Sequence, residues 1–242
     1  MDKMTVHIVD DDDRIRKSLR LLIESVGLPV KAYGSAEAFL DTYEASAFGC
    51  LLLDVRMPGM SGIELQETLA ARGISLPVLM ITGYADVPTA VRALKNGALD
   101  FIEKPFNRQE LLEKVHLAIA RDREAKKTNA VRGSILSRMA TLTLREVEVM
   151  QRVVAGQSNK VIAIELDICT KTVEGHRARV MEKMDVRTIA QLVWANAIAR
   201  GYRPETTAPD PPDEVVSDVL RIDDHRRRLR SGSSEPTPSE PT

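Results

Sequence analysis

The sequence predicts a doubly wound α/β domain with a five-stranded parallel sheet, followed by an all-α domain of four helices and a disordered tail. Over residues 1–120, short apolar runs alternate with amphipathic stretches, the pattern of a parallel sheet covered by helices on both faces. Over residues 141–202 only helical patterns remain, and the polar residues 203–242 cannot bury a core. The charged residues 121–140 are expected to be a linker, partly helical as an extension of the preceding helix.

Five apolar runs are the expected strands of the first domain, at residues 5–9, 30–33, 50–54, 77–82 and 98–104. The first helix is expected over about residues 14–26, ahead of Gly27. Later helices have recognisable start signals, which are a capping box of Ser61 with Glu64, a cap at Asp86, and Asn107 with Glu110. Strands and helices therefore alternate along the whole domain.

The second domain has two capping boxes, Thr143 with Glu146 and Thr188 with Gln191. The first box opens a helix that ends at Gly156, and the second opens the last helix, which ends at about residue 201. Between them, helices are expected over residues 159–166 and 170–184, joined by the short turn LDIC. A short helix, a tight turn and a longer helix are typical of a helix-turn-helix.

Charge is distributed unevenly along a chain whose formal net charge is only −1. Residues 1–121 have 14 basic and 17 acidic side chains, residues 122–201 have 14 and 9, and residues 202–242 have 6 and 9. The basic middle segment predicts contact with a polyanion. Cys50 and Cys169 match no ligand spacing and indicate reduced thiols, and no apolar run is long enough to cross a bilayer, so we expect a soluble cytoplasmic protein.

Polar side chains stand where four of the expected strands end, namely the acids of residues 10–13, Asp54, Thr82 and Lys104. Because the carboxyl ends of parallel strands meet at one edge of a sheet, we expect these groups to converge there. Each has a simpler explanation alone, since acids cap helices and Asp54 could start a turn. Carboxylates gathered this closely need a cation, and an oxygen-rich site of this kind suits Mg²⁺.

Residues 5–120 resemble the receiver domain of two-component response regulators. The resemblance rests on Asp10 and Asp11 after the first strand, the string LLLDVRMPGMSG, ITG at the end of the fourth strand and FIEKPF at the end of the fifth. The strings YGSAEAFL (33–40) and TGYADVPTAV (82–91) are similar to the FixJ-like branch. The resemblance implies that Asp54 is the phosphoacceptor of a sensor histidine kinase.

The resemblance also implies a Mg²⁺ site, with Asp11 and Asp54 as ligands, Asp10 acting through water and the backbone carbonyl of Arg56 as a further ligand. Within four consecutive acids, Asp11 and Asp12 could exchange roles.

Three further roles follow from the resemblance. Lys104 would contact the incoming phosphoryl group, Thr82 would move to hydrogen-bond it, and Phe101 would follow as an aromatic switch. Lys104–Pro105 would be a cis peptide bond.

The strings LTLREVEVM and GQSNKVIAIELDICTKTVEGHRARVMEKM, with the closing helix, resemble the LuxR-type DNA-binding domain over its full length. The resemblance implies a recognition helix that begins at Thr170 and lies in the major groove. Glu174 could contact cytosine or orient Arg177. The expected DNA contacts are Asn159, Lys160, Thr170, Lys171, Thr172, Glu174, His176, Arg177 and Arg179.

The sequence as a whole predicts a transcription regulator controlled by phosphorylation of Asp54. We expect it to dimerise through the fourth helix and fifth strand of the receiver, to bind paired promoter half-sites on double-stranded DNA, and to meet RNA polymerase there. Its chemistry would be limited to slow Mg²⁺-dependent autophosphorylation from small donors and autodephosphorylation. Two alternatives stay open, which are a phosphatase resembling the haloacid dehalogenases and a receiver that dimerises without phosphate.

Overall fold

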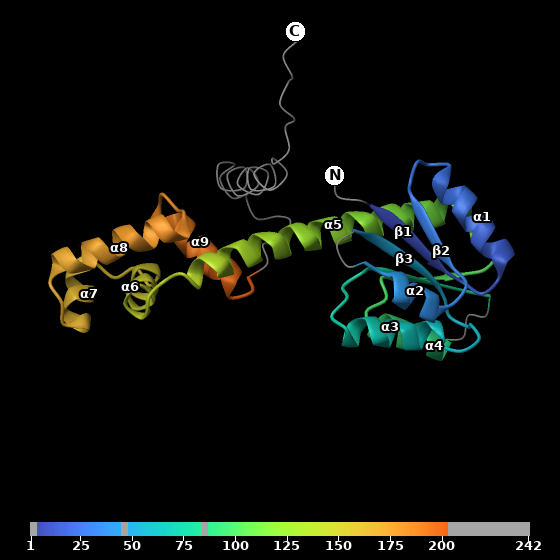
Figure 1. Ribbon diagram of the computed structural model, residues 1–242, viewed down its shortest axis with the longest axis horizontal. Helices are drawn as coiled ribbons and strands as arrows, with labels where there is room; N and C mark the ends of the chain where they lie inside the picture. Colours follow the sequence, from blue (N-terminus) through green and yellow to red (C-terminus); the bar gives the residue numbers. More distant parts are fainter. Residues whose placement is uncertain (1–3, 45–47, 84–86, 203–242) are drawn as a thin grey trace, which may run out of the picture. The chain divides into compact units, whose positions relative to one another are not determined.

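The computed structural model describes residues 4–44, 48–83 and 87–202 (Figure 1). The described residues form two compact units, which divide between Lys127 and Thr128. Each unit has its own buried core. The predicted cap Asp86 and the predicted disordered tail, residues 203–242, lie outside the described residues.

The first unit is built on the predicted five-stranded parallel sheet. Its strands are β1 (Thr5–Val9), β2 (Val30–Tyr33), β3 (Gly49–Asp54), β4 (Val78–Thr82) and β5 (Asp100–Glu103), in the order β2-β1-β3-β4-β5. Val9 lies beside Leu53 in the β1–β3 pairing, so Asp10 and Asp54 reach the same edge of the sheet. The chain changes direction across the sheet between β1 and β3, which is where ligand sites form in folds of this kind.

Helices cover both faces of this sheet (Figure 1). Helices α1 (Asp13–Glu24) and α5 (Arg108–Met139) cover one face, and their apolar side chains pack with alternate residues of β1, β3 and β4. Helices α2 (Ala36–Thr42), α3 (Gly62–Ala71) and α4 (Val87–Lys95) cover the other face. All six residues of β3 are buried, so the strand that ends at Asp54 lies in the middle of both cores.

Local signals in the sequence explain where the helices begin. The predicted capping box of Ser61 and Glu64 is confirmed at the start of α3, and the Asn107 side chain accepts from the backbone N–H groups of Gln109 and Glu110 at the start of α5. Asp12 is the N-cap of α1, where its carboxylate accepts from the backbone N–H of Arg14 at 2.9 Å. One member of the acidic run therefore has a capping role, as the simpler explanation requires.

The second unit contains α6 (Leu144–Val154), α7 (Asn159–Leu166), α8 (Thr170–Met184) and α9 (Ile189–Ala199). Both predicted capping boxes are confirmed, at Thr143 before α6 and at Thr188 before α9. The four helices surround a core that includes Ile162, Val173 and Val180.

The segment expected to be a partly helical linker is helical throughout, since α5 is continuous from Arg108 to Met139. Its last turns belong to the second unit, because Ile135 is buried there and Val131 and Met139 pack against the same core. Arg132 and Arg138 add hydrogen bonds to the backbone carbonyls of Ala199 and Met184, at the ends of α9 and α8. The apolar side chains four residues apart in this segment are therefore core positions.

Candidate functional site

The carboxyl edge of the sheet holds two buried carboxylates against one lysine. Lys104 follows β5, and its Nζ lies 2.7 Å from Asp10 Oδ2 and 2.7 Å from Asp54 Oδ1. Asp54 Oδ2 also accepts from the backbone N–H of Arg56 at 3.0 Å. Asp10 and Asp54 are almost completely buried, while Lys104 keeps a minor part of its side chain in contact with solvent. Lys104 is thereby in direct contact with both Asp10 and Asp54, as the sequence predicts for this edge of the sheet.

The charges at this edge do not balance. Burial raises the pKa of Asp54, the Lys104 ammonium offsets this only in part, and the nearby Asp10 carboxylate raises it further. Burial opposes the charge on Lys104, but its hydrogen bonds to Asp10 and Asp54 outweigh burial and raise its pKa. Two buried carboxylates share one cation, so the site can accept additional positive charge.

A divalent cation fits this set of donors if it also takes backbone and water ligands. No group of three or more acidic, histidine or cysteine side chains is gathered as a ready-made metal site within residues 4–44, 48–83 and 87–202. Mg²⁺ commonly binds through one or two carboxylates and keeps several waters. Asp11 is exposed beside the buried pair, whereas the Asp12 carboxylate is occupied by the backbone and guanidinium of Arg14.

Thr82 and Phe101 lie on β4 and β5, the two strands on one side of β3. Thr82 is buried at the end of β4, and its carbonyl accepts from the backbone N–H of Lys104 at 2.7 Å. Phe101 is half-buried on β5 and packs against the core beneath α3 and α4. The predicted cis peptide bond between Lys104 and Pro105 is confirmed. Thr82 is therefore at the same end of the sheet as Asp54, whereas Phe101 lies further back along β5, opposite Met80 of β4.

Gly62, the first residue of α3, has a role that was not predicted from the sequence. A Cβ added at this position would lie 2.1 Å from the Asp54 carbonyl oxygen, so only glycine allows α3 to approach the end of β3 this closely. The signal in the sequence is a glycine directly after the capping residue Ser61, where a helix former would otherwise be favoured.

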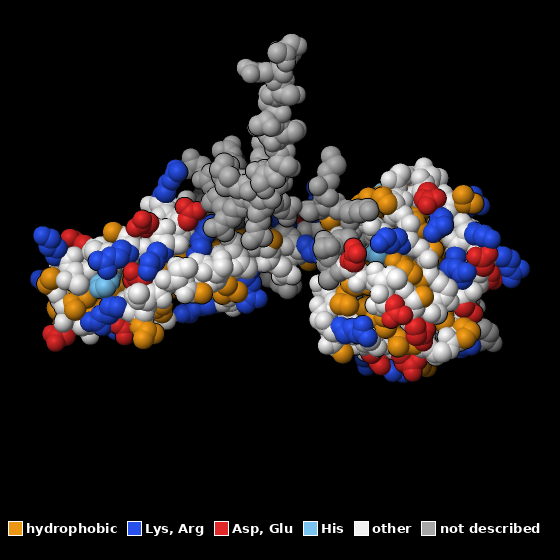
Figure 2. Space-filling model, viewed as in Figure 1, with side chains coloured by type: hydrophobic (Ala, Val, Ile, Leu, Met, Phe, Trp, Pro, Cys, Tyr) orange, Lys and Arg blue, Asp and Glu red, His pale blue; other side chains and the backbone are white. Residues whose placement is uncertain are grey.

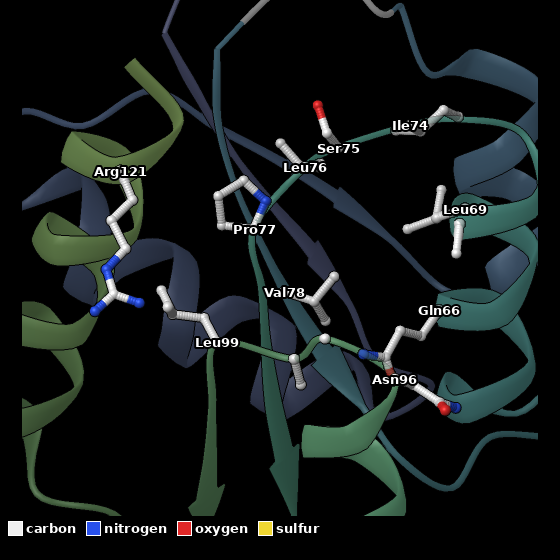
Figure 3. Close-up of a pocket in the computed structure, with 13 residues that line it drawn as sticks. Gln66, Leu69, Ile74, Ser75, Leu76, Pro77, Val78, Asn96, Leu99 and Arg121 are labelled. Carbon is white, nitrogen blue, oxygen red and sulfur yellow. The ribbon is translucent and has the colours of Figure 1, made fainter. Parts of the chain in front are cut away.

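A separate hollow of about 450 Å³ lies at the other end of β4 and β5 (Figure 3). It is lined mainly by apolar side chains, among them Leu69, Val78 and Leu99, with Gln66 and Arg121 at its sides. The side-chain amide of Gln66 is hydrogen-bonded to the backbone of α4, because its Nε2 donates to the Ala93 carbonyl at 3.0 Å. None of the predicted site residues lines it.

The second candidate site is the surface of α7 and α8, where Lys and Arg side chains are gathered (Figure 2). Asp167 adopts a left-handed conformation, with φ of 52°, and ends α7 sharply before α8 begins. This is the helix-turn-helix geometry that the sequence predicts. Six predicted DNA contacts are exposed, namely Lys160, Thr170, Lys171, Thr172, Glu174 and Arg179.

The other three predicted contacts, Asn159, His176 and Arg177, are half-buried. The Arg177 guanidinium donates to the Asn159 side-chain oxygen, so this pair joins α8 to α7. Either residue would therefore have to contact DNA while it keeps this hydrogen bond, or after the bond breaks.

Comparisons with known proteins match both units. Residues 6–116 match the response regulator receiver domain, and residues 140–195 match the bacterial regulatory proteins of the luxR family. The transcriptional regulatory protein FixJ of Bradyrhizobium diazoefficiens is 44% identical over 78% of this chain and 92% of its own length. Nodulation protein W of the same organism is 44% identical over 79% of this chain and 84% of its own length.

Two solved structures give the same result. The response regulator StyR is similar with a TM-score of 0.74 and 41% identity, over 80% of this chain and 98% of that one. Full-length FixJ from B. japonicum is similar with a TM-score of 0.52 and 42% identity, over 84% of this chain and all of that one.

A receiver domain joined to a LuxR-type DNA-binding domain defines a two-component response regulator that controls transcription. Within that class, the chain belongs to the FixJ-like branch. A receiver implies a histidine kinase as partner and a Mg²⁺ ion at the acidic site, and the second domain implies binding to DNA. In the part of the chain that the structure describes, no helix has both the length and the apolar character needed to cross a membrane.

Proposed function

We propose that Asp54 is the phosphoacceptor of a sensor histidine kinase and that its phosphorylation promotes dimerisation and promoter binding. The observation that supports this most directly is the Lys104 ammonium, 2.7 Å from Asp54 Oδ1 and 2.7 Å from Asp10 Oδ2. A carboxylate is a poor nucleophile toward a phosphoryl group because both are anionic. Transfer therefore depends on fixed positive charge beside the acceptor and on its orientation.

The residues around Asp54 provide that setting. The backbone N–H of Arg56 holds Oδ2 and Lys104 holds Oδ1, so the carboxylate is fixed in direction. Asp11 rather than Asp12 is the direct Mg²⁺ ligand, because the Asp12 carboxylate already caps α1 and binds Arg14. Bound Mg²⁺, held by Asp11, Asp54, the Arg56 carbonyl and Asp10 through water, would neutralise charge that develops on the phosphoryl oxygens.

Phosphorylation changes the conformation through Thr82 and Phe101. The phosphoryl group adds about −1.5 to −2 charge at one buried point. Thr82, at the end of β4, binds that group in the active conformation, and Phe101 on β5 moves inward with it. A difference in binding of about 1–3 kcal/mol between two conformations is enough to couple the site to a distant surface.

That surface is formed by α4 and β5. Val87, Val91 and Leu94 are exposed apolar side chains on α4, which a symmetric partner receiver would cover. The resulting dimer would place two α8 helices on paired half-sites of a promoter. RNA polymerase is the further partner that we propose at that promoter.

Labelling with radioactive acetyl phosphate tests the acceptor. Wild-type protein is expected to form an acyl phosphate that is stable in acid and labile in base, and its formation is expected to require Mg²⁺. Asp54→Asn is expected to form none. Asp41→Asn, which changes an exposed carboxylate on α2, is the matched control and is expected to label normally. Wild-type labelling that survives in Asp54→Asn would overturn the assignment.

The same samples address the alternatives. If wild-type protein takes no label, the receiver that dimerises without phosphate is favoured. If small phosphate esters are hydrolysed with turnover and Asp54→Ala keeps that activity, the phosphatase is favoured. Sedimentation of phosphorylated and unphosphorylated protein tests the coupling of phosphorylation to dimerisation. Promoter DNA is first selected with the phosphorylated protein, and the affinities of both forms for that DNA are then compared.

A further inference from the structure

Arg16 on α1 holds the acidic loop between β1 and α1 by its backbone. Its Nη1 donates to the carbonyl oxygen of Asp10 at 2.7 Å and to that of Asp11 at 2.9 Å. Its Nη2 pairs with Asp13 at 3.1 Å. The Arg16 side chain is only 19% exposed, so this guanidinium is packed in place.

Asp11 depends on this contact because, within the described residues, its own side chain has no partner. Among the residues that the structure describes, no side chain or backbone group hydrogen-bonds or pairs with the Asp11 carboxylate. The place from which that carboxylate can reach the metal site is therefore set by the backbone of Asp10 and Asp11, which Arg16 holds. Asp10, by contrast, is held through its side chain by Lys104 and by the backbone N–H of Asp12.

We propose that Arg16 is a positioning residue for the metal site, which fixes the backbone of Asp10 and Asp11 so that the Asp11 carboxylate points where Mg²⁺ binds. This rests on the proposed function, in which Asp11 and Asp54 are metal ligands. Groups that orient metal ligands typically change metal affinity by about 10- to 100-fold when removed.

A purely electrostatic role for Arg16 predicts the opposite sign. A positive charge beside a cation site repels the cation, so removing it would tighten Mg²⁺ binding. Two substitutions separate the possibilities. Arg16→Lys keeps the charge but loses the planar fork that reaches two carbonyls, and Arg16→Gln loses both. Positioning predicts weaker binding in both variants, whereas charge alone predicts tighter binding in Arg16→Gln and no change in Arg16→Lys.

The experiment is calorimetric titration of the full-length, unphosphorylated protein with Mg²⁺, with Mn²⁺ as a second probe. Arg16→Lys and Arg16→Gln are each expected to raise the Mg²⁺ Kd about tenfold or more. Arg14→Gln is the matched control, since Arg14 lies on the same turn of the helix and its side chain is 91% exposed. It pairs with the side chain of Asp12 rather than with the carbonyl of Asp11. Its Kd is expected to stay within twofold of wild type.

A second measurement separates positioning from general damage. The rate of acetyl phosphate labelling is followed as Mg²⁺ is raised, and a positioning role shifts the half-saturating Mg²⁺ concentration while the plateau stays near wild type. A lower plateau with unchanged half-saturation, or a wild-type Kd in Arg16→Lys, would overturn the proposal. Asp11→Asn and Asp54→Asn test the site itself, because wild-type Mg²⁺ affinity in both would remove the proposed metal site whatever Arg16 does.

Discussion

Replacing Glu146 by Gln is expected to destabilise the DNA-binding unit while leaving its helix cap in place. Glu146 is 2% exposed, and its carboxylate accepts from the backbone N–H of Thr143 at 2.8 Å and from Lys183 Nζ at 2.7 Å. Glutamine can keep the bond to Thr143, as Gln191 does in the capping box of α9. The substitution therefore removes the charge that faces Lys183 and little else.

The size of the loss follows from the pKa of Glu146. The hydrogen bond from Lys183, the backbone N–H of Thr143 and its hydroxyl together lower that pKa from 4.5 to about 2. A shift of this size corresponds to about 3 kcal/mol of stability at neutral pH. Glutamine keeps the Thr143 part of this stabilisation, and because Lys183 is 33% exposed, solvent screens part of the rest. We expect a loss of about 2 kcal/mol, which is typical of a hydrogen bond to a charged group.

Urea unfolding of the full chain, followed by tryptophan fluorescence, measures this directly. Trp194 is the only tryptophan in the sequence, and it packs against the core of the DNA-binding unit. Glu148→Gln is the control, because Glu148 makes an exposed ion pair with Arg145 at 2.8 Å on the same helix. Exposed pairs contribute about 0.2–1 kcal/mol.

The pH dependence gives a second check. Since the pKa of Glu146 is lower in the folded state, its stabilisation is complete above about pH 4.5 and is lost as the pH falls toward 2. The difference between wild type and Glu146→Gln should therefore narrow from pH 5.5 to pH 3. A constant difference over that range, or a loss no larger than that of Glu148→Gln, would refute the argument.

Three further variants test other contacts. Gly62→Ala places a Cβ 2.1 Å from the Asp54 carbonyl oxygen, so circular dichroism should show a destabilised protein and acetyl phosphate labelling should slow. Ile135→Ala empties a buried position and should cost about 2–4 kcal/mol by the same fluorescence assay, whereas the exposed Leu136→Ala should cost little. Lys171→Gln should reduce by about one the slope of log affinity for DNA against log salt, if Lys171 contacts a phosphate.

Strands and helix starts could be predicted because their signals are local. The apolar run that ends at Asp54 is buried on both faces, and each capping box combines two side chains three residues apart. Asp10, Asp54 and Lys104 could be placed at one sheet edge for a similar reason. Each ends or directly follows a strand, and the carboxyl ends of parallel strands meet at one edge.

Contacts between distant helices had no such signal. Val131 and Ile135 are apolar residues within a charged stretch, and only the core that they join shows that α5 extends into the second unit. Arg177 and Asn159 are each predicted to contact DNA, and that prediction stays open, but the sequence did not indicate the hydrogen bond that joins them between α8 and α7. A basic or polar side chain on a helix-turn-helix has two possible partners, and the sequence alone does not choose between them.

Two carboxylates with lysine partners, Glu146 and Asp54, differ in the direction of their pKa shifts, and the difference supports the proposal that Asp54 is a phosphoacceptor. Glu146 has Lys183 close by and donors from Thr143, and its pKa falls to about 2. Asp54 also hydrogen-bonds to a lysine at 2.7 Å, yet its pKa is raised, because burial dominates and Asp10 takes a share of the same ammonium. A contact that only stabilises the fold is expected to resemble the first arrangement, in which Lys183 and Thr143 donate to the Glu146 carboxylate. The second leaves negative charge uncompensated at the sheet edge, which is the condition under which a cation gains most from binding there.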